Sequence, residues 1–289
     1  MSEFKDKVVV VTGAGGGLGR SHALEFARRG ARVVVNDLGG STDGVGSGDM
    51  ADTVVQEIRD AGGEAIANKA SVSDRDGAKS IIDDAVSAYG TVDILVNNAG
   101  ILRDKSFKKM TLDDWDLLID VHLNGTAYVT HAAWPIMYEQ NYGRILLTSS
   151  VSGILGNFGQ ANYGAAKTGM LGLAFVLAQE GAAHNIRVNV LSPGAATRLT
   201  NTVPGRDEDL DNPDPLRSPE MVTPAVFFMC QGNAPTGKVI HAHNGKFSMF
   251  AIFNNEGLDL GLNSSFEALE ENRDKLLDMS EAIEGRFGG

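Results

Sequence analysis

Tyr163 and Lys167 lie four positions apart in the small-residue stretch NYGAAK at 162–167. Residues at this spacing share one face of a helix, so the phenol and the ammonium are predicted to point into one pocket. An ammonium favours a neighbouring phenolate, and Lys167 is therefore expected to lower the pKa of Tyr163 towards neutrality. Such a pair can carry a proton. The same spacing also occurs on ordinary helix surfaces, so the rest of the chain must decide between these interpretations.

A glycine-rich turn near the N-terminus predicts a phosphate-binding site. The segment VVVVTGAGGGLGR places Gly13, Gly17 and Gly19 in a GxxxGxG pattern between an apolar run and a helical stretch. Glycines let a backbone turn tightly and approach a pyrophosphate, whose charge then lies at the positive end of a helix. A purely structural turn is the alternative, but the strand–turn–helix context favours a bound nucleotide.

An acidic residue follows the next apolar run and bears on the kind of nucleotide. Asp37 ends ARVVVND, about 20 residues beyond the glycines, and a carboxylate there can accept both hydroxyls of an adenosine ribose. The same charge would repel a 2′-phosphate. A strand-end cap is the alternative role for Asp37. With the glycine turn beside it, the sequence predicts NAD as the cofactor in preference to NADP.

Alternating apolar and amphipathic segments predict the elements that position these residues. The expected strands are continuous apolar runs, which are typical of a parallel sheet buried on both faces, and they lie at 7–13, 31–37, 92–100, 143–150, 186–194 and 237–243. The expected helices lie at 17–29, 49–61, 74–89, 111–140 and 161–183. This alternation predicts a single Rossmann-type α/β domain, a doubly wound parallel sheet with helices on both faces. The domain is expected over 1–253, and a tail with a polar helix, 254–289, is expected to pack on it.

Composition narrows the partners and the compartment. The net charge of -12 argues against general nucleic-acid binding and against an anionic membrane surface. No apolar run approaches the length of a membrane span, and no metal ion is predicted. A single cysteine, Cys230, excludes an intrachain disulfide. The final residues RFGG match no retrieval signal, so a cytoplasmic location is expected.

Several motifs together resemble the short-chain dehydrogenase/reductase family. They are the GxxxGxG turn, NNAG at 97–100, a serine thirteen residues before the tyrosine of YxxxK, and PG after VN within 189–194, in family order. The stretches NNAGILRD and SGILGNFGQANYGAAK further resemble the (3R)-hydroxyacyl-CoA dehydrogenase part of the peroxisomal multifunctional enzyme and its stand-alone bacterial relatives. The hydratase and sterol-carrier parts of that enzyme have no counterpart in this sequence, so the resemblance implies a single activity. It also implies a homodimer or homotetramer paired through the helices at 111–140 and 161–183.

The resemblance assigns roles residue by residue. It implies that Tyr163 is the general acid/base, that Lys167 holds the nicotinamide ribose and lowers the pKa of Tyr163, and that Ser150 hydrogen-bonds the substrate oxygen. The chemistry would be oxidation of a secondary alcohol with NAD as acceptor. The residues expected to line the cofactor are Gly13, Gly17, Leu18, Gly19, Asp37, Ser71, Val72, Asn97, Ala99, Gly100, Tyr163, Lys167, Ala195 and Thr197.

Two positions depart from the usual family pattern. His122 in VHLNG occupies the place of an asparagine that completes a catalytic tetrad in most members. It could add a titrating group to the proton relay, or it could be a buried histidine that shapes a helix kink. Five residues after Pro193 the family usually carries a hydroxyl, where this chain has Arg198. Thr197 could serve the nicotinamide carboxamide instead, and the arginine matches the hydroxyacyl-CoA group.

The substrate is less specified than the chemistry. Basic residues follow NNAG and could hold coenzyme A phosphates, or they could simply form a solvated helix flank; they are Arg103, Lys105, Lys108 and Lys109. The segment 195–220 is expected to cover the substrate, because ligands in such sheets lie beyond the carboxyl ends of the strands. A hydroxysteroid or another secondary alcohol would need the same catalytic groups. A non-catalytic nucleotide-binding regulator is a further alternative, although such proteins usually lose the tyrosine or the lysine.

Overall fold

The computed structural model of the protein describes residues 3–202, 209–210 and 214–285. Residues 203–208 and 211–213, within the segment expected to cover the substrate, lie outside the described part. The chain divides into two compact units, Met1–Ser248 and Met249–Gly289, which are described separately below.

The first unit is built on an eight-stranded sheet with the order β3-β2-β1-β4-β5-β6-β7-β8, whose last strand, β8, runs across the boundary at Ser248. The pairs from β3 to β7 are all parallel. A turn at Asn244 and Gly245, both with positive φ, leads from β7 into β8. The strands are β1 (Val8–Thr12), β2 (Arg32–Asn36), β3 (Glu64–Asn68), β4 (Ile94–Asn97), β5 (Gly143–Thr148), β6 (Ile186–Gly194), β7 (Val239–His243) and β8 (Lys246–Phe250). The predicted α/β fold with a mostly parallel sheet is confirmed.

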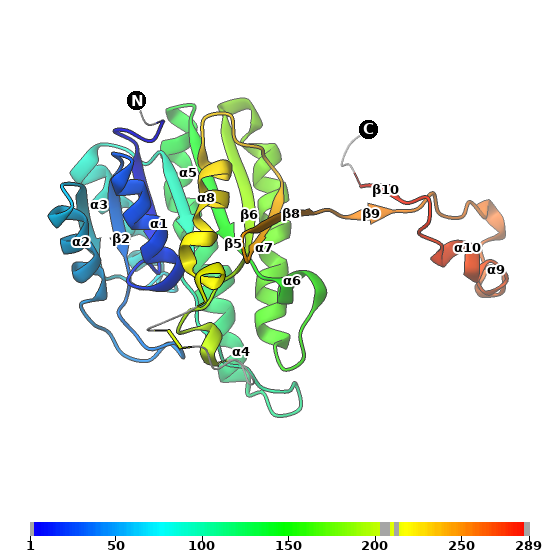
Figure 1. Ribbon diagram of the computed structural model, residues 1–289. Coiled ribbons are helices and arrows are strands. Elements are labelled where there is room, and N and C mark those ends of the chain that lie inside the picture. Colours follow the sequence, from blue (N-terminus) through cyan, green and yellow to red (C-terminus); the bar gives the residue numbers. More distant parts are fainter. Residues whose placement is uncertain (1–2, 203–208, 211–213, 286–289) are drawn as a thin grey trace. The chain divides into compact units, whose positions relative to one another are not determined.

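Helices cover both faces of this sheet (Figure 1). Helix α1 packs against α2 and α8, whereas α5 packs against α3, and α7 lies along β5 and β6. The α-helices of this unit are α1 (Gly17–Arg28), α2 (Met50–Asp60), α3 (Arg75–Tyr89), α4 (Leu112–Ile119), α5 (Gly125–Glu139), α6 (Val151–Leu155), α7 (Ala161–Glu180) and α8 (Thr223–Cys230). The 3-10 turns are η2 (Ala182–His184), η3 (Thr200–Thr202), η4 (Pro215–Arg217) and η5 (Pro219–Met221).

The long helix expected at 111–140 has three parts. A π-helical turn, η1 (Asp120–Asn124), separates α4 from α5 and carries His122. Such turns add one residue to a helix and shift the faces on either side of it. Thr111 caps the start of α4, where its side chain accepts a hydrogen bond from the Asp114 N–H at 3.1 Å.

Apolar strands give the first unit its core. All five residues of β1 and all six of β5 are buried, as expected for strands covered on both faces. The rings of Phe4, Phe26 and Phe227 meet pairwise with centroids 4.6 to 5.4 Å apart. The strands thus form a well-packed core, and a ligand is expected in the loops beyond their carboxyl ends.

The second unit contains short elements only. Strands β9 (Phe253–Asn254) and β10 (Ile283–Glu284) pair antiparallel, and the unit also holds η6 (Gly261–Asn263). The polar helix expected in the tail consists of α9 (Phe266–Glu271) and α10 (Arg273–Leu277), separated by Asn272. The Asn272 side chain donates to the Ala268 carbonyl at 2.8 Å, a local bond that competes with a continuous helix. The boundary after residue 253 and the packing of the tail on the first unit stay predictions.

None of the helices in the described part of the chain has both the length and the apolar character needed to cross a bilayer.

Candidate active site

The turn between β1 and α1 has the shape that its glycines predicted. Gly13 and Gly17 have φ of 62° and 50°, values that favour glycine over residues with a side chain. A side chain at Gly19 would begin 2.2 Å from the Gly13 carbonyl oxygen. The Asn98 amide fixes the turn by donating to the carbonyls of Thr12 and Gly13, both at 3.1 Å. The turn is thus held open with its backbone exposed to a cavity.

Asp37 lies beside this turn at the end of β2. Its Oδ2 accepts a hydrogen bond from the Gly15 N–H at 2.8 Å, and its Oδ1 accepts one from the Gly39 N–H at 2.7 Å. Carboxylate oxygens have further lone pairs, so both can still accept from ribose hydroxyls. Asp37 therefore fixes the turn and keeps lone pairs for a further donor, and its role at a ribose stays a prediction.

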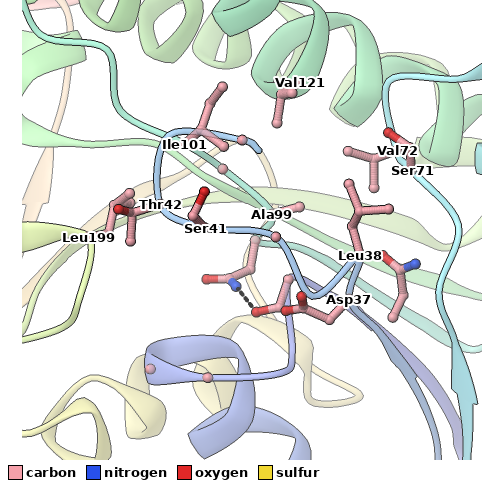
Figure 2. A pocket seen from close by; sticks show the side chains of 18 of the residues that line it. Asp37, Leu38, Ser41, Thr42, Ser71, Val72, Ala99, Ile101, Val121 and Leu199 are labelled. Atoms are coloured by element: carbon pink, nitrogen blue, oxygen red, sulfur yellow. Dashed lines mark hydrogen bonds between the residues drawn. The ribbon is translucent and has the colours of Figure 1, made fainter. Parts of the chain in front are cut away.

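A cavity of about 270 Å³ opens over the turn (Figure 2). The residues around it come from the carboxyl ends of β1, β2 and β4 and from segments near β3, α4 and β6. Of the residues expected to line a cofactor, nine lie in its wall: Gly13, Gly17, Leu18, Asp37, Ser71, Val72, Ala99, Gly100 and Thr197.

Five expected cofactor residues do not line this cavity: Tyr163 and Lys167, whose place is described below, and Asn97, Gly19 and Ala195. Asn97 is buried and donates to the Thr130 hydroxyl at 3.0 Å, so its place in the wall is taken by Asn98. Gly19 packs on Gly13 instead of facing the cavity. Ala195 is 2% exposed and its carbonyl accepts from the Thr200 hydroxyl at 3.2 Å. Asn97, Gly19 and Ala195 therefore support the glycine turn and the strand ends without lining the cavity.

The loop 38–48 supplies part of the wall that the sequence interpretation missed. Gly40, Ser41, Thr42 and Gly44 line the cavity, and Figure 2 shows Ser41 and Thr42 along this loop. The loop is fastened near its middle, because the Thr42 carbonyl accepts from the Leu102 N–H at 3.0 Å and the Asp43 carbonyl accepts from Arg103 Nε at 3.0 Å. Its glycine content was the signal that could have indicated a close approach to a ligand.

The sequence interpretation also did not place Arg198 in the wall of the cavity. Among the described residues that line the cavity, Arg198 carries the positive charge and Asp37 carries the negative charge. The Arg198 Nη2 lies 3.2 Å from the point where a side chain at Gly16 would begin and contacts Met50 Sδ at 3.5 Å. Thr197, next to it, faces Gly17. The glycine turn therefore meets a carboxylate, a guanidinium and a hydroxyl-bearing side chain in succession.

The groups expected to do chemistry meet where α6 and α7 cross. Ser150 caps α6, and its side chain lies near enough to the Tyr163 phenol to lower the pKa of that phenol. Lys167 Nζ lies 5.4 Å from the centroid of the Tyr163 ring and donates to the Thr148 carbonyl. Gly153 lets the helices approach, since a side chain there would begin 2.5 Å from Lys167 Cβ. The sequence-predicted trio is thus assembled at one place.

The acidities of this trio differ from the expectation. Burial raises the pKa of Tyr163 to about 12, with the Ser150 hydrogen bond acting in the opposite direction and the charge of Asp104 raising it further. Burial lowers the pKa of Lys167 to about 7. The predicted lowering of the Tyr163 pKa is therefore wrong, because burial is the largest effect on this phenol and favours its uncharged form.

His122 lies against the same site. It is 1% exposed, its ring meets the Tyr163 ring edge-on at 5.2 Å, and it packs on Gly100, where a side chain would begin 2.3 Å from Cε1. Its Nε2 lies 2.8 Å from the Ile101 carbonyl oxygen and 3.0 Å from the Ile101 nitrogen. Burial lowers the pKa of His122 well below its ordinary value, and Lys167 acts in the same direction. The lowered pKa favours the uncharged ring, and both roles foreseen for His122 stay predictions.

The basic residues near the mouth are partly neutralised. The Asp114 side chain is 6% exposed and pairs with Arg103 at 3.0 Å and Lys105 at 2.7 Å. Lys105 and Arg103 hold the pKa of Asp114 far below its usual range. Lys108 and Lys109 are exposed. The cluster foreseen as a phosphate site is therefore half committed to an internal ion-pair network.

Comparison with known proteins agrees with this geometry. The short chain dehydrogenase family matches residues 7–209. A short-chain type dehydrogenase/reductase of Mycobacterium tuberculosis is 47% identical over 286 residues, covering 98% of both chains. The mouse peroxisomal multifunctional enzyme type 2 is 54% identical over 228 residues, which are 78% of this chain and 30% of that enzyme. The crystal structure of a short chain dehydrogenase from Mycobacterium avium superposes with a TM-score of 0.82 at 38% identity, covering 95% of both chains.

Proposed function

Because the chain belongs to the short-chain dehydrogenase family, we propose that it is an NAD-dependent oxidoreductase that oxidises a (3R)-hydroxyacyl-CoA to the 3-ketoacyl-CoA. The observation that carries the proposal is the assembly of Ser150, Tyr163 and Lys167 near a cavity that is lined by the glycine turn and by Asp37. His122 connects the two, since it packs on the cavity residue Gly100 and on the Tyr163 ring.

The residues present fit a nicotinamide dinucleotide. The glycine turn, where a side chain would fill the space, suits a pyrophosphate. Asp37 suits unmodified ribose hydroxyls and disfavours a 2′-phosphate. Thr197 and Gly100 lie in the same wall for the remaining half. When bound, the nicotinamide would accept a hydride from the carbinol carbon of the substrate.

The chain itself handles the oxygen and its proton. The hydroxyl groups of Ser150 and Tyr163 lie near each other, so a substrate oxygen placed between them would be held by both. During oxidation the substrate O–H proton passes to the Tyr163 oxygen, which must first have lost its own proton. Lys167, whose Nζ lies 5.4 Å from the centroid of the Tyr163 ring, would stabilise the phenolate when it is charged. In the reverse direction the protonated Tyr163 donates to the carbonyl oxygen.

The substrate class rests on resemblance together with surface charge. The exposed Lys108 and Lys109 remain as candidate contacts for coenzyme A phosphates, whereas Arg103 and Lys105 are engaged with Asp114. A hydroxysteroid or another secondary alcohol is the alternative substrate. A non-catalytic regulator is the remote alternative, and the retained Tyr163 and Lys167 disfavour it. We also propose a homodimer or homotetramer and a cytoplasmic location. Mass photometry would test the assembly, and cell fractionation would test the location, since some relatives carry peroxisomal names.

Steady-state kinetics would test the activity. The protein should oxidise (3R)-hydroxyacyl-CoA with NAD and ignore the 3S enantiomer, because Ser150 and Tyr163 fix the oxygen while the nicotinamide fixes the path of the hydride. Tyr163→Phe should lower turnover by about 10² to 10⁴ while NADH binding persists. Lys108→Ala with Lys109→Ala should raise KM for the thioester and leave kcat largely intact. Efficient hydroxysteroid oxidation without thioester turnover would overturn the substrate and leave the dehydrogenase.

A further inference from the structure

Arg103 is connected to the wall of the cavity without lining the cavity itself. Its Nε donates to the Asp43 carbonyl at 3.0 Å, within the loop 38–48. Four residues of this loop belong to the described lining of the cavity, and Arg103 does not; the four are Gly40, Ser41, Thr42 and Gly44. Any effect of Arg103 on a bound ligand must therefore pass through the loop.

The tip of the loop, residues 41–45, is a compact turn with few ties to the rest of the chain. The Ser41 N–H donates to the Val45 carbonyl at 2.8 Å, and Val45 is 60% exposed. Among the residues that the structure describes, two hydrogen bonds join the tip to another segment. One is the bond from Arg103, and the other is donated by the Leu102 N–H to a backbone carbonyl of the tip at 3.0 Å. The position of the tip therefore depends on residues 102 and 103.

The same guanidinium is anchored to a buried carboxylate of α4. Arg103 Nη1 donates to Asp114 Oδ1 at 3.0 Å, and the two side chains are 26% and 6% exposed. Asp114 is itself held in place, because it accepts from Lys105 at 2.7 Å and from the Thr111 hydroxyl at 2.8 Å. The planar guanidinium thus joins α4 to the loop through two donors in fixed geometry. A lysine at this position could reach one of the two acceptors but could not join both.

The tip packs against the opposite side of the cavity. A side chain at Gly44 would begin 3.2 Å from Ile101 Cδ1 and 3.8 Å from Leu117 Cδ2, and both of these residues line the cavity. Figure 2 shows the loop passing from Leu38 towards Ile101. The wall between Leu38 and Ile101 is therefore complete only while the tip stays in place.

We propose that Arg103 is a positioning residue for the dinucleotide: it fastens the loop 38–48 to Asp114 and thereby sets how tightly and for how long the cofactor is retained. This inference rests on the cofactor of the proposed function. A loop that is ordered before binding loses less conformational entropy when the ligand binds, so fastening the loop favours the complex. In this role Arg103 needs no contact with coenzyme A phosphates.

NADH fluorescence tests the proposal in the absence of substrate. Arg103→Lys keeps a cation beside Asp114 but loses the bond to the Asp43 carbonyl. The Kd for NADH should therefore rise about tenfold, the size of effect expected from one charge-assisted hydrogen bond. Stopped-flow displacement should place the change mainly in koff, because the loop no longer retains the ligand. Lys105→Ala is the matched control, since it removes a cation from the same carboxylate and no hydrogen bond of the loop, and its Kd should stay near that of the wild type.

Gly44→Ala tests the same connection from the loop side, and it carries the test if Arg103→Lys does not fold. Gly44 has a φ of 88°, and an added side chain would begin 3.2 Å from Ile101 Cδ1. The change should displace the tip while Arg103 and Asp114 remain paired, so the Kd for NADH should rise here as well. The double variant should bind NADH no more weakly than the weaker single variant, because both changes release the same tip.

Other outcomes would contradict the proposal. An unchanged Kd and koff in Arg103→Lys, even with a lower melting temperature, would show that Arg103 only stabilises the fold. A higher KM for hydroxyacyl-CoA with an unchanged Kd for NADH would overturn the inference in favour of a contact with coenzyme A. Failure of the wild type to bind NADH would overturn the proposed cofactor together with the inference. NADH binding without turnover of hydroxyacyl-CoA would overturn only the substrate assignment.

Discussion

At the scale of single residues, Asp37 is predicted to choose between the two nicotinamide dinucleotides. Its carboxylate stands beside the glycine turn at hydrogen-bonding distance from the Gly15 N–H, where an adenosine ribose would lie. A 2′-phosphate there would bring like charges together, so kcat/KM with NAD should exceed that with NADP at least about tenfold. Asp37→Ser should narrow this ratio, mainly by improving NADP. Comparable efficiency of the wild type with both dinucleotides would contradict the role of Asp37.

Residue patterns predicted part of the candidate site and missed another part. The motifs placed Ser150, Tyr163 and Lys167 correctly at one point, because their spacing is tied to one helix and one strand end. They did not reveal that Asn97 turns inwards to Thr130, since adjacent residues of a strand face opposite sides and either asparagine could have lined the cavity. Acidity was also beyond reach, because the pKa of Tyr163 depends on burial that only the folded chain defines.

At the scale of elements, the crossing of α6 and α7 is predicted to control catalysis. Gly153 lets the two helices touch, and a methyl group there would begin 2.5 Å from Lys167 Cβ and 2.7 Å from the Lys167 carbonyl carbon. Gly153→Ala should therefore separate Ser150 from Tyr163 and lower kcat by about 10². Gly172→Ala is the matched control in α7, since a side chain there meets no atom within 4 Å. Equal activity of both variants would argue against this close approach.

The ion-pair network of Asp114 predicts a pH-dependent contribution to stability. Its folded pKa lies below the unfolded value, so the pairing stabilises the protein above about pH 4 and the contribution disappears as pH falls further. Asp114→Asn should lower the melting temperature at neutral pH, and the difference from the wild type should shrink on acidification. Asp113→Asn, at an exposed neighbouring position, should show no such trend. Calorimetry across pH would measure both.

The predicted bounds of strands agree with the structure where every residue of the strand is buried. They differ from it where buried and exposed residues are mixed. The apolar runs at 7–13 and 143–150 became β1 and β5 with nearly the same bounds. Strand β3 was not predicted, because Glu64–Asn68 mixes exposed and buried residues at the edge of the sheet. The division of the helix at 111–140 was missed as well, since a π-helical turn depends on how its two flanking faces pack.

At the scale of the whole molecule, the first unit is predicted to fold without the second. Its core cluster lies entirely between Phe4 and Ala242. A chain ending after Phe250 should unfold cooperatively and bind NADH. If the tail packs on this unit, as the sequence predicted, the truncated protein should melt a few degrees lower, because ~1 kcal/mol corresponds to ~2–4 °C at this size. Loss of cooperative unfolding would show that the tail completes the fold.

The π-helical turn at Asp120–Asn124 gives one long helix two rotational phases. An α-helix advances by about 100° for each residue, so the added residue turns α5 relative to α4 by that angle. Helix α4, with Leu118 buried, therefore packs against α7, while α5, with Val129 and Ala133 buried, packs against α3 and the sheet. Deleting one residue from this turn would restore a regular helix and force one stretch to show its apolar side to water. One extra residue thus changes which side of the helix is buried, with no loop between α4 and α5.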